Sequence, residues 1–527
     1  MAKSAMRTVV VLGASYGGCP AIKILAEKLP RNYKLIAIDR NTHMNHVYTF
    51  SRFTVKTKHA PKGFIPYKHL LDPQPKHAPE IDLSTPPETP PIHPSVLNQE
   101  DEVLAGRARH QFIQGVVTKL SSKEITFVRP SEEARPDFKG AAATNVDSKG
   151  TNMTYGEFDG PEEKIEYDYL LYALGSTLPD PVNVWKPLRG QPRITGEERK
   201  LGSKKHGLRF MAFQSEKFKA ANKILIVGGG ALGIQYATDL KDVYPEKKVT
   251  LLHSRTRLLP IYPIKLHVKV METLTKMGVD VVLGERVMTW PDEPEVLDGK
   301  IKYVTTDKGR TFKADIVLPC TGQRPNVSLM AQLDPALISP ATGRIRVLPT
   351  QQARLSRPAS VENTDKQLAK SSIPTVTPPL TPSSATFNGS DEAQLQTQKN
   401  YNHIFAIGDC AQTKAIQAGH TAFGQGEVAA RNILRLIAKE EGKVEKINDG
   451  ELEEYEAPKP AIKLTLGIKN GVLVDGESVT PNDTGEEDLH ALLMWYVFTF
   501  LLSLLLANNV DRRGRGLPNA MGMDIDE

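Results

Sequence analysis

The sequence predicts an α/β fold built from two Rossmann-like domains, the second inserted into the first, followed by a small C-terminal region. Residues 8–39 and 223–253 each read as an apolar strand, a glycine-rich turn, a helix and a second strand, which is the pattern of a βαβ unit. The chain has 527 residues, of which 40% are hydrophobic, so it can bury the cores of several domains.

The first glycine turn follows an apolar strand and opens a helix. It matches the dinucleotide fingerprint G-x-G-x-x-G at Gly13 and Gly18, while Ser15 replaces the middle glycine and Gly17 precedes the last one. Asp39 ends the next strand, where a carboxylate can accept hydrogen bonds from a ribose diol. The combination predicts a dinucleotide site, and plain packing of a βαβ unit is the alternative.

The second glycine turn matches the fingerprint completely, at Gly228, Gly230 and Gly233. The helix that follows would direct its free N–H groups at a pyrophosphate. The next strand ends at His253, and the acid expected there is missing.

Arginines follow the second strand end instead of an acid. Arg255 or Arg257 could pair with a 2′-phosphate, which a carboxylate would repel, so the site should accept NADPH as well as NADH. His253 and Arg255 are therefore candidate cofactor contacts, and the alternative is that both arginines are only solvated surface residues.

Three further strand ends repeat the pattern of a polar or glycine-containing turn after an apolar run. They are 402–407 before Gly408 and Asp409, 169–174 before Gly175, and 317–320 before Gly322.

These five signatures, in their order along the chain, resemble the two-dinucleotide-binding-domain flavoproteins of the pyridine-nucleotide-disulfide reductase superfamily. Within it the chain is most similar to the apoptosis-inducing-factor-like branch, which includes ferroptosis suppressor protein and is related to type II NADH dehydrogenases. The resemblance implies that FAD binds residues 1–205 and 326–440, that NADH or NADPH binds the inserted domain at 206–325, and that 441–527 completes the fold. It also implies that Gly408 and Asp409 bind the ribityl and phosphate part of FAD.

The activity implied by the resemblance is hydride transfer from NAD(P)H to FAD, followed by electron transfer to a quinone-like acceptor. Relatives commonly carry a glutamate near the flavin–nicotinamide contact where this chain has Gln235, which can hydrogen-bond but cannot take up a proton. Lys414 would stabilise negative charge on the flavin. Gln425, with Gln417 and His420, would contact the acceptor, and solvated or capping roles are the alternative for each.

Composition excludes several other classes of protein. Lys and Arg total 67 against 61 for Asp and Glu, a net charge of +6 without a dense basic block, so no nucleic-acid partner is expected. The cysteines, Cys19, Cys320 and Cys410, form no C-x-x-C pair, which argues against a redox dithiol and a zinc ribbon. No metal site is expected.

Polar or proline-rich insertions interrupt the FAD-binding part of the chain. They are 72–102, 130–163 and 354–399, and each is expected to form a surface loop without a function of its own.

An uncharged apolar run covers residues 491–507 near the C-terminus. As a helix it would span about 25 Å, slightly less than the ~30 Å hydrocarbon core. With no signal peptide predicted, a partly embedded anchor on the cytoplasmic side of a membrane fits better than a full crossing, and a buried core helix is the alternative. The sequence does not distinguish a mitochondrial outer surface from a lipid droplet, and a homodimer is left open.

Two other functions share the nucleotide-binding motifs. One is a flavin-dependent oxidase or monooxygenase of a biosynthetic pathway. The other is a redox sensor or cell-death effector that binds NAD(P)H with weak turnover, which Gln235 slightly favours.

Overall fold

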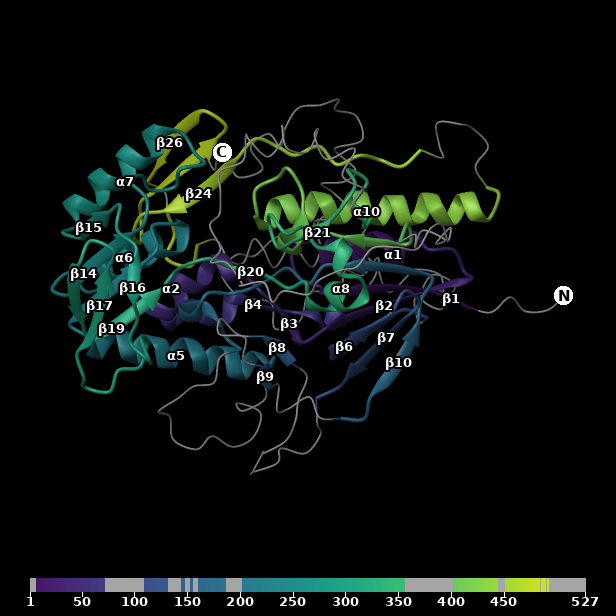
Figure 1. Ribbon diagram of the computed structural model, residues 1–527, viewed down its shortest axis with the longest axis horizontal. Helices are drawn as coiled ribbons and strands as arrows, with labels where there is room; N and C mark the ends of the chain where they lie inside the picture. The colour runs from purple at the N-terminus through teal and green to yellow at the C-terminus, as the bar shows by residue number, and fades with distance from the viewer. Residues whose placement is uncertain are drawn as a thin grey trace, which may run out of the picture.

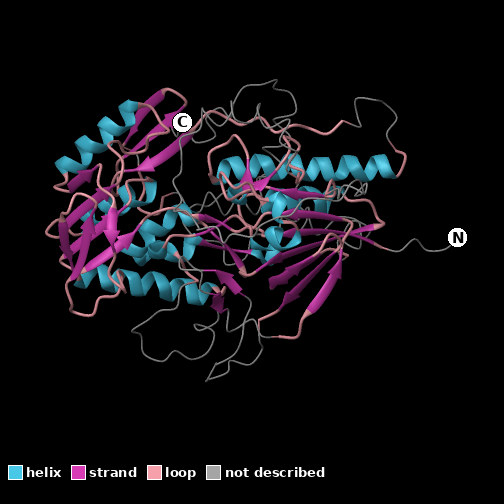
Figure 2. Ribbon diagram, in the orientation of Figure 1, coloured by secondary structure: helices cyan, strands magenta, loops and turns pink. Residues whose placement is uncertain are grey.

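The computed structural model describes residues 6–71, 109–130, 144–146, 152–154, 160–185, 201–355, 401–443, 451–483, 485–489 and 491. The predicted insertions 72–102, 130–163 and 354–399 lie wholly or mostly outside these residues. Figures 1 and 2 show two sheet-containing bodies side by side, each with helices packed on it.

The first body is built on a parallel five-stranded sheet whose middle strand begins the fold. Its strands in spatial order are β22 (Ile404–Ala406), β11 (Tyr169–Tyr172), β1 (Arg7–Leu12), β2 (Tyr33–Asp39) and β5 (Gln111–Gln114). Strand β1 is apolar on both faces and almost entirely buried, as expected for a parallel strand covered on both sides.

The alternation of β1 side chains divides them between two cores. Val9 and Val11 pack with α1 (Gly18–Lys28) and α10 (Gly419–Glu440), and Val10 and Leu12 pack on the other face. That other face is covered by α8 (Ser328–Leu333) and by an antiparallel sheet of β10 (Glu163–Glu166), β7 (Glu124–Val128) and β6 (Val116–Leu120).

The second body has a parallel four-stranded sheet. Its order is β15 (Asp280–Leu283), β14 (Lys248–His253), β13 (Lys223–Val227) and β19 (Ile316–Pro319). One face packs on α5 (Lys204–Ala220), α6 (Ala231–Val243) and α7 (Ile264–Lys276). The other packs on β16 (Val287–Thr289), β17 (Lys302–Thr306) and β18 (Thr311–Ala314).

The chain enters and leaves the second body between strands of the first. Strand β11 precedes the whole second sheet, β22 follows it, and these two strands pair directly with each other. The expected α/β fold with parallel sheets is confirmed.

Short elements complete the fold. They are β3 (His43–Asn45), η1 (Val47–Thr49), α2 (Phe50–Val55), η2 (Thr57–Gly63), β4 (Phe64–Pro66), η3 (Tyr67–His69), β8 (Thr144–Val146), β9 (Asn152–Thr154), β12 (Ser176–Thr177), η4 (Asp180–Val182), β20 (Arg324–Pro325), η6 (Pro335–Leu337), β21 (Ile345–Arg346), η8 (Gly408–Cys410) and β23 (Ala411–Gln412).

The C-terminal region is an antiparallel sheet that packs on the second body. Its strands are β24 (Ala461–Thr465), β25 (Gly471–Asp475) and β26 (Ser478–Asn482). Leu464 and Val472 share a core with residues of α6, although α10 of the first body directly precedes this region in the chain. Figure 1 shows β24 and β26 beside α7, at the far end of the molecule from most of α10.

Of the predicted apolar segment 491–507, only Ala491 belongs to the described residues, and it is buried. Among the helices that are described, none has both the length and the apolar character needed to span a bilayer.

Candidate functional site

The two glycine turns have matching backbone geometry. Gly13 N donates to Ile38 O and Gly228 N donates to Leu252 O, each over 2.8 Å. Each turn joins the carboxyl end of a central strand to the start of a helix, and this edge of a parallel sheet is where ligands bind in doubly wound folds.

The first glycine of each turn is required by the protein itself. A Cβ on Gly13 would lie 2.5 Å from Ala173 O, and one on Gly228 would lie 2.6 Å from Cys320 O. Their φ angles are +90° and +126°, which side chains other than that of glycine rarely adopt. Because these positions have no side chain, the residue that follows the neighbouring strand can approach the turn closely.

The last glycine of each turn allows the helix to pack against the turn. A Cβ on Gly18 or Gly233 would lie 1.8 or 1.9 Å from the carbonyl oxygen of the first glycine. Gly17 also lies against α10, since a Cβ there would be 2.9 Å from Ala422 O.

Gly230, the middle glycine of the second turn, differs from the others. Its φ is −84°, which any residue can adopt, and a Cβ added to it would meet no protein atom within 4 Å. Neither packing nor backbone strain in the protein accounts for a glycine here. The open space fits the close approach of a ligand to the backbone. In the first turn the equivalent residue, Ser15, is half-buried.

Asp39, the last residue of β2, forms a hydrogen bond with the first glycine turn. Its Oδ2 accepts from Ala14 N over 2.8 Å, and its Oδ1 accepts from the backbone N of Asn41, also over 2.8 Å. Burial raises the pKa of Asp39, and these hydrogen bonds act in the opposite direction. The carboxylate therefore lies beside the turn, at the strand end where a ribose diol is expected.

The residues at and just after the end of β14 differ in their exposure to solvent. His253 Nδ1 accepts from Gly229 N over 3.1 Å, and burial followed by the charge of Arg255 lowers the pKa of His253. Arg257 is half-buried and donates to Tyr262 O, whereas Arg255 is exposed. Of the two predicted arginines, Arg255 is the better placed to meet a ligand.

Gly408 and Asp409 follow β22, and each forms a hydrogen bond with a side chain from another part of the chain. Asp409 Oδ2 accepts from Ser176 Oγ over 2.6 Å, and Gly408 N donates to Gln425 Oε1 over 2.7 Å. Gln425, which we expected to contact an acceptor, is only 1% exposed. In the structure the Gln425 side chain is therefore buried and binds the backbone of the turn at Gly408.

The two connections between the bodies run side by side. Strands β12 and β20 pair antiparallel, and Asn326 N donates to Gly175 O over 2.9 Å. Gly175 and Gly322 have positive φ angles of +57° and +26°, and an added Cβ would meet nothing within 4 Å at either one. This pairing brings Gly175 and Gly322, the glycines predicted after two strand ends, to the boundary between the two bodies.

The loop before α10 and the first turn of that helix carry the other predicted contacts. Lys414, Gln417 and His420 are all exposed. Gly419, the first residue of α10, donates its N–H to Tyr48 OH over 2.5 Å. Tyr48 lies outside every motif, so sequence reasoning had no signal for its contact with this helix start.

Gln235 points to the C-terminal region. Its Nε2 donates to Thr465 Oγ1 of β24 over 3.0 Å. The two residues are 230 positions apart in the chain, so no local pattern could have identified this partner.

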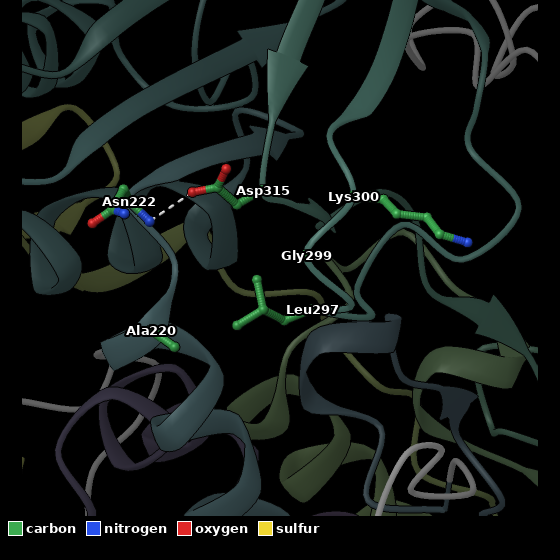
Figure 3. A pocket seen from close by; sticks show the side chains of 6 residues that line it. All are labelled: Ala220, Asn222, Leu297, Gly299, Lys300 and Asp315. Carbon is green, nitrogen blue, oxygen red and sulfur yellow. Dashed lines mark hydrogen bonds between the residues drawn. The ribbon is translucent and has the colours of Figure 1, made fainter.

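A cavity of about 430 Å³ lies elsewhere on the second body. Figure 3 shows Asn222 and Asp315 beside it, and these residues directly precede β13 and β19. The cavity is therefore at the amino ends of the strands, opposite the edge that carries the glycine turns, and it does not belong to the candidate site.

Comparison with known proteins agrees with this geometry. The chain is 33% identical to Fe-regulated protein 8 of Mycosarcoma maydis over 93% of its own length and 94% of that protein. It is 25% identical to ferroptosis suppressor protein 1 of Mus musculus, over 66% of this chain and 74% of that protein.

A solved structure of a NAD-dependent persulfide reductase from A. fulgidus is similar in fold, with a TM-score of 0.50 and 16% identity. The match covers 88% of this chain and 63% of that structure, so the chain spans less than two thirds of its length.

The family model described as pyridine nucleotide-disulphide oxidoreductase matches residues 7–353. That family uses FAD and NAD(P)H, and the glycines, the acid after β2 and the open space at Gly230 fit one dinucleotide at each turn. The chain belongs to the pyridine nucleotide-disulphide oxidoreductase family, as its motifs predict.

Proposed function

We propose that the protein is an FAD-dependent NAD(P)H oxidoreductase that passes electrons to a quinone-like acceptor. The observation that carries the proposal is Gly230, where an unstrained glycine leaves open space at the second turn. When bound, FAD would supply the two-electron chemistry that links the nicotinamide to the acceptor. The first turn, Asp39 and Asp409 would hold it, and the second turn would orient the nicotinamide cofactor.

The acceptor is proposed to be an external molecule because the cysteines are unsuited to serve. All three are buried and unpaired. They lie on α1, after β19 and in η8. Burial raises the pKa of Cys19 to about 11 and that of Cys410 to about 12, which disfavours the reactive thiolate.

The exposed side chains around the start of α10 support a small acceptor near the flavin. Lys414, Gln417 and His420 are accessible on one short stretch that begins five residues after Asp409. A quinone needs such polar groups at its carbonyl oxygens and a cation to stabilise developing negative charge.

Anaerobic stopped-flow absorbance tests the proposal directly. The flavin-loaded protein is mixed with NADH or NADPH while the oxidised flavin band is followed, and a short-chain quinone is then added. Fast bleaching and quinone-dependent recovery of the band are expected. Recovery with oxygen but not with quinone would favour an oxidase, and a flavin that neither nucleotide reduces would overturn the proposal.

A redox sensor is the second candidate, and the specific observation for it is Gln235. An amide in place of a carboxylate cannot take up a proton, and Thr465 already binds it. The same experiment separates the two, because a sensor would form a long-lived complex with the nucleotide and turn over slowly.

We further propose that residues 491–507 attach the protein to the cytoplasmic side of a membrane. Acidic residues just before this segment pair with side chains that follow α2: Lys62 Nζ lies 2.6 Å from Asp488 Oδ2, and Glu487 contacts Lys56 and His59. These contacts hold the residues just before the segment at a defined place on the protein. Co-sedimentation with liposomes should fall when the chain is ended after Ala491, and unchanged binding would contradict the proposal.

A further inference from the structure

Helix α7 carries aliphatic side chains outside the core as well as inside it. The residues that face the core are spaced four apart and fully buried: Leu266, Val270 and Leu274. Outside the core, Ile264 and Val268 are 54% and 49% exposed, and Ile261, in the loop just before the helix, is exposed to a similar degree. Figure 1 shows α7 at the edge of the molecule.

The exposed residues of α7 form two parallel rows. Ile264 and Val268 are four residues apart, and so are Lys265 and Lys269, so each pair follows the helix axis. Isoleucine and valine favour a helix less than lysine or alanine does, and about half of each aliphatic side chain stays outside the core. Neither helix formation nor packing accounts for an aliphatic row here, and the row therefore fits contact with an apolar phase outside the protein.

Positive charge lies beside the aliphatic row. Residues 254–279 include five lysines and arginines and one acidic residue, Glu272, so their net charge is +4 with histidine neutral. Glu272 Oε2 lies 3.9 Å from Lys269 Nζ, and both side chains are exposed. Lys265 and Arg255 are exposed as well. A partner that matches this face therefore combines negative charge with an apolar layer.

A membrane with anionic lipids has both properties. An amphipathic helix at a membrane surface lies in the plane of the headgroups, with its aliphatic side chains at the acyl boundary and its lysines toward anionic lipids. Lysine suits such a place, since its apolar stem can lie along the lipid while the ammonium group stays in water. A second copy of the chain fits less well, because a symmetric contact would bring the same positive charges together.

We propose that the outer face of α7 docks on a membrane that contains anionic lipids. Ile264 and Val268 enter the headgroup region, and Lys265 and Lys269 pair with lipid phosphates. The inference extends the proposed membrane attachment, since it adds a contact on the second body to the one proposed for residues 491–507. With both contacts made, the second body has a defined orientation on the membrane.

Site-specific fluorescent labelling of the full-length protein tests the proposal. Cys19, Cys320 and Cys410 are buried, so under native conditions a maleimide label attaches to a newly introduced exposed cysteine. Val268→Cys places a nitrobenzoxadiazole dye, which brightens in an apolar environment, on the aliphatic row. Met288→Cys, at an exposed site on β16 over the other face of the same parallel sheet, is the matched control.

The labelled proteins are titrated with phosphatidylcholine vesicles that contain or lack phosphatidylserine. With phosphatidylserine, the dye at position 268 should brighten and its emission should shift to shorter wavelength, whereas the dye at position 288 should not respond. Vesicles without phosphatidylserine should give no response at the same lipid concentration. Lys265→Gln with Lys269→Gln should raise the lipid concentration for half the response about tenfold or more, because each lysine near an anionic surface contributes about fivefold.

Several results would reject docking through α7. They are a silent dye at position 268, equal responses at positions 268 and 288, and a response that survives the loss of both lysines. A response to polyglutamate but not to vesicles would also overturn the proposal, in favour of an acidic protein partner.

The outcome is separable from that of the attachment through residues 491–507. A protein that sediments with liposomes only while it keeps this segment, and whose dye at position 268 stays silent, would retain the anchor and reject docking of α7. A dye that responds, while removal of the segment leaves sedimentation unchanged, would do the reverse. Neither readout depends on electron transfer, so the oxidoreductase is tested separately.

Discussion

Arg52 Nη2 lies 2.8 Å from Asp239 Oδ1, and neither side chain has any exposed surface. Arg52 belongs to α2 and Asp239 to α6, so this buried ion pair joins two helices that are far apart in the chain. Burial raises the pKa of Asp239, while the charge of Arg52 and its hydrogen bond act against that rise. Asp239 therefore depends on Arg52 to remain charged inside the protein.

Removing the Asp239 charge should be strongly destabilising. Asp239→Asn leaves the Arg52 cation buried without a counter-charge, which costs about 3–5 kcal/mol in comparable sites. Urea unfolding followed by circular dichroism measures the change. The exposed pair of Lys164 and Glu124 is the control, and Glu124→Gln should cost less than about 1 kcal/mol. An equal, small effect of both substitutions would contradict the prediction.

The parallel sheets and the two glycine turns could be predicted because their signals are local. An apolar strand, glycines at fixed spacing and a helix lie within one βαβ unit, and Gly13 and Gly228 lie where the fingerprint puts them. The contact between Gln235 and Thr465 could not be predicted, since it joins residues from different domains that no short motif connects.

The role of Gln425 shows a second limit of prediction from the sequence alone. Its sequence position after Gly408 and Asp409 indicates proximity to the flavin, but only the structure shows that its oxygen accepts from Gly408 N. A polar residue near a site can either face the ligand or support the backbone, and spacing alone does not separate these roles.

Gly230 gives a prediction with a matched control in the same turn. Gly230→Val places its side chain in open space and keeps an ordinary φ of −84°, so the stability of the protein and its flavin content should not change. The Kd of NADH should rise about tenfold or more because the side chain occupies the path of the pyrophosphate.

Gly228→Ala should behave in the opposite way. Its φ of +126° and the 2.6 Å approach to Cys320 O make any side chain strained, at a cost of about 1–3 kcal/mol for the backbone alone. Thermal unfolding and calorimetric titration of both variants check the pair. Normal NADH binding by Gly230→Val would show that the open space is not a ligand path.

Arg255 is predicted to recognise the 2′-phosphate of NADPH. It is exposed after β14, whereas Arg257 is already bonded to Tyr262 O. Arg255→Ala should raise the KM for NADPH by about tenfold through loss of a charge-assisted hydrogen bond and leave the KM for NADH unchanged. Lys300→Ala, at the cavity on the opposite edge of the same body, is the control and should change neither value. An unchanged ratio of the two KM values in Arg255→Ala would reject this role.

Two buried histidines should make the protein lose stability below neutral pH. Burial lowers the pKa of His43 to about 3 and that of His46 to about 4, from an ordinary value of 6.5. Between pH 6.5 and these values the unfolded chain binds protons that the folded protein does not. Their stabilising contribution is therefore complete above about pH 6.5 and is lost as the pH falls, by up to about 1.4 kcal/mol per pH unit for each histidine.

Substitution of the two histidines should remove this pH dependence. His46 Nδ1 lies 2.9 Å from Tyr16 OH and His43 Nε2 lies 3.0 Å from Asn45 Oδ1, so glutamine can keep a polar partner at both places. His43→Gln and His46→Gln should each reduce the slope of the unfolding free energy between pH 5 and pH 6.5, and the double variant should reduce it by the sum. Urea unfolding at a series of pH values measures the slopes. A double variant that keeps the wild-type slope would mean that other groups, not these buried imidazoles, control stability in acid.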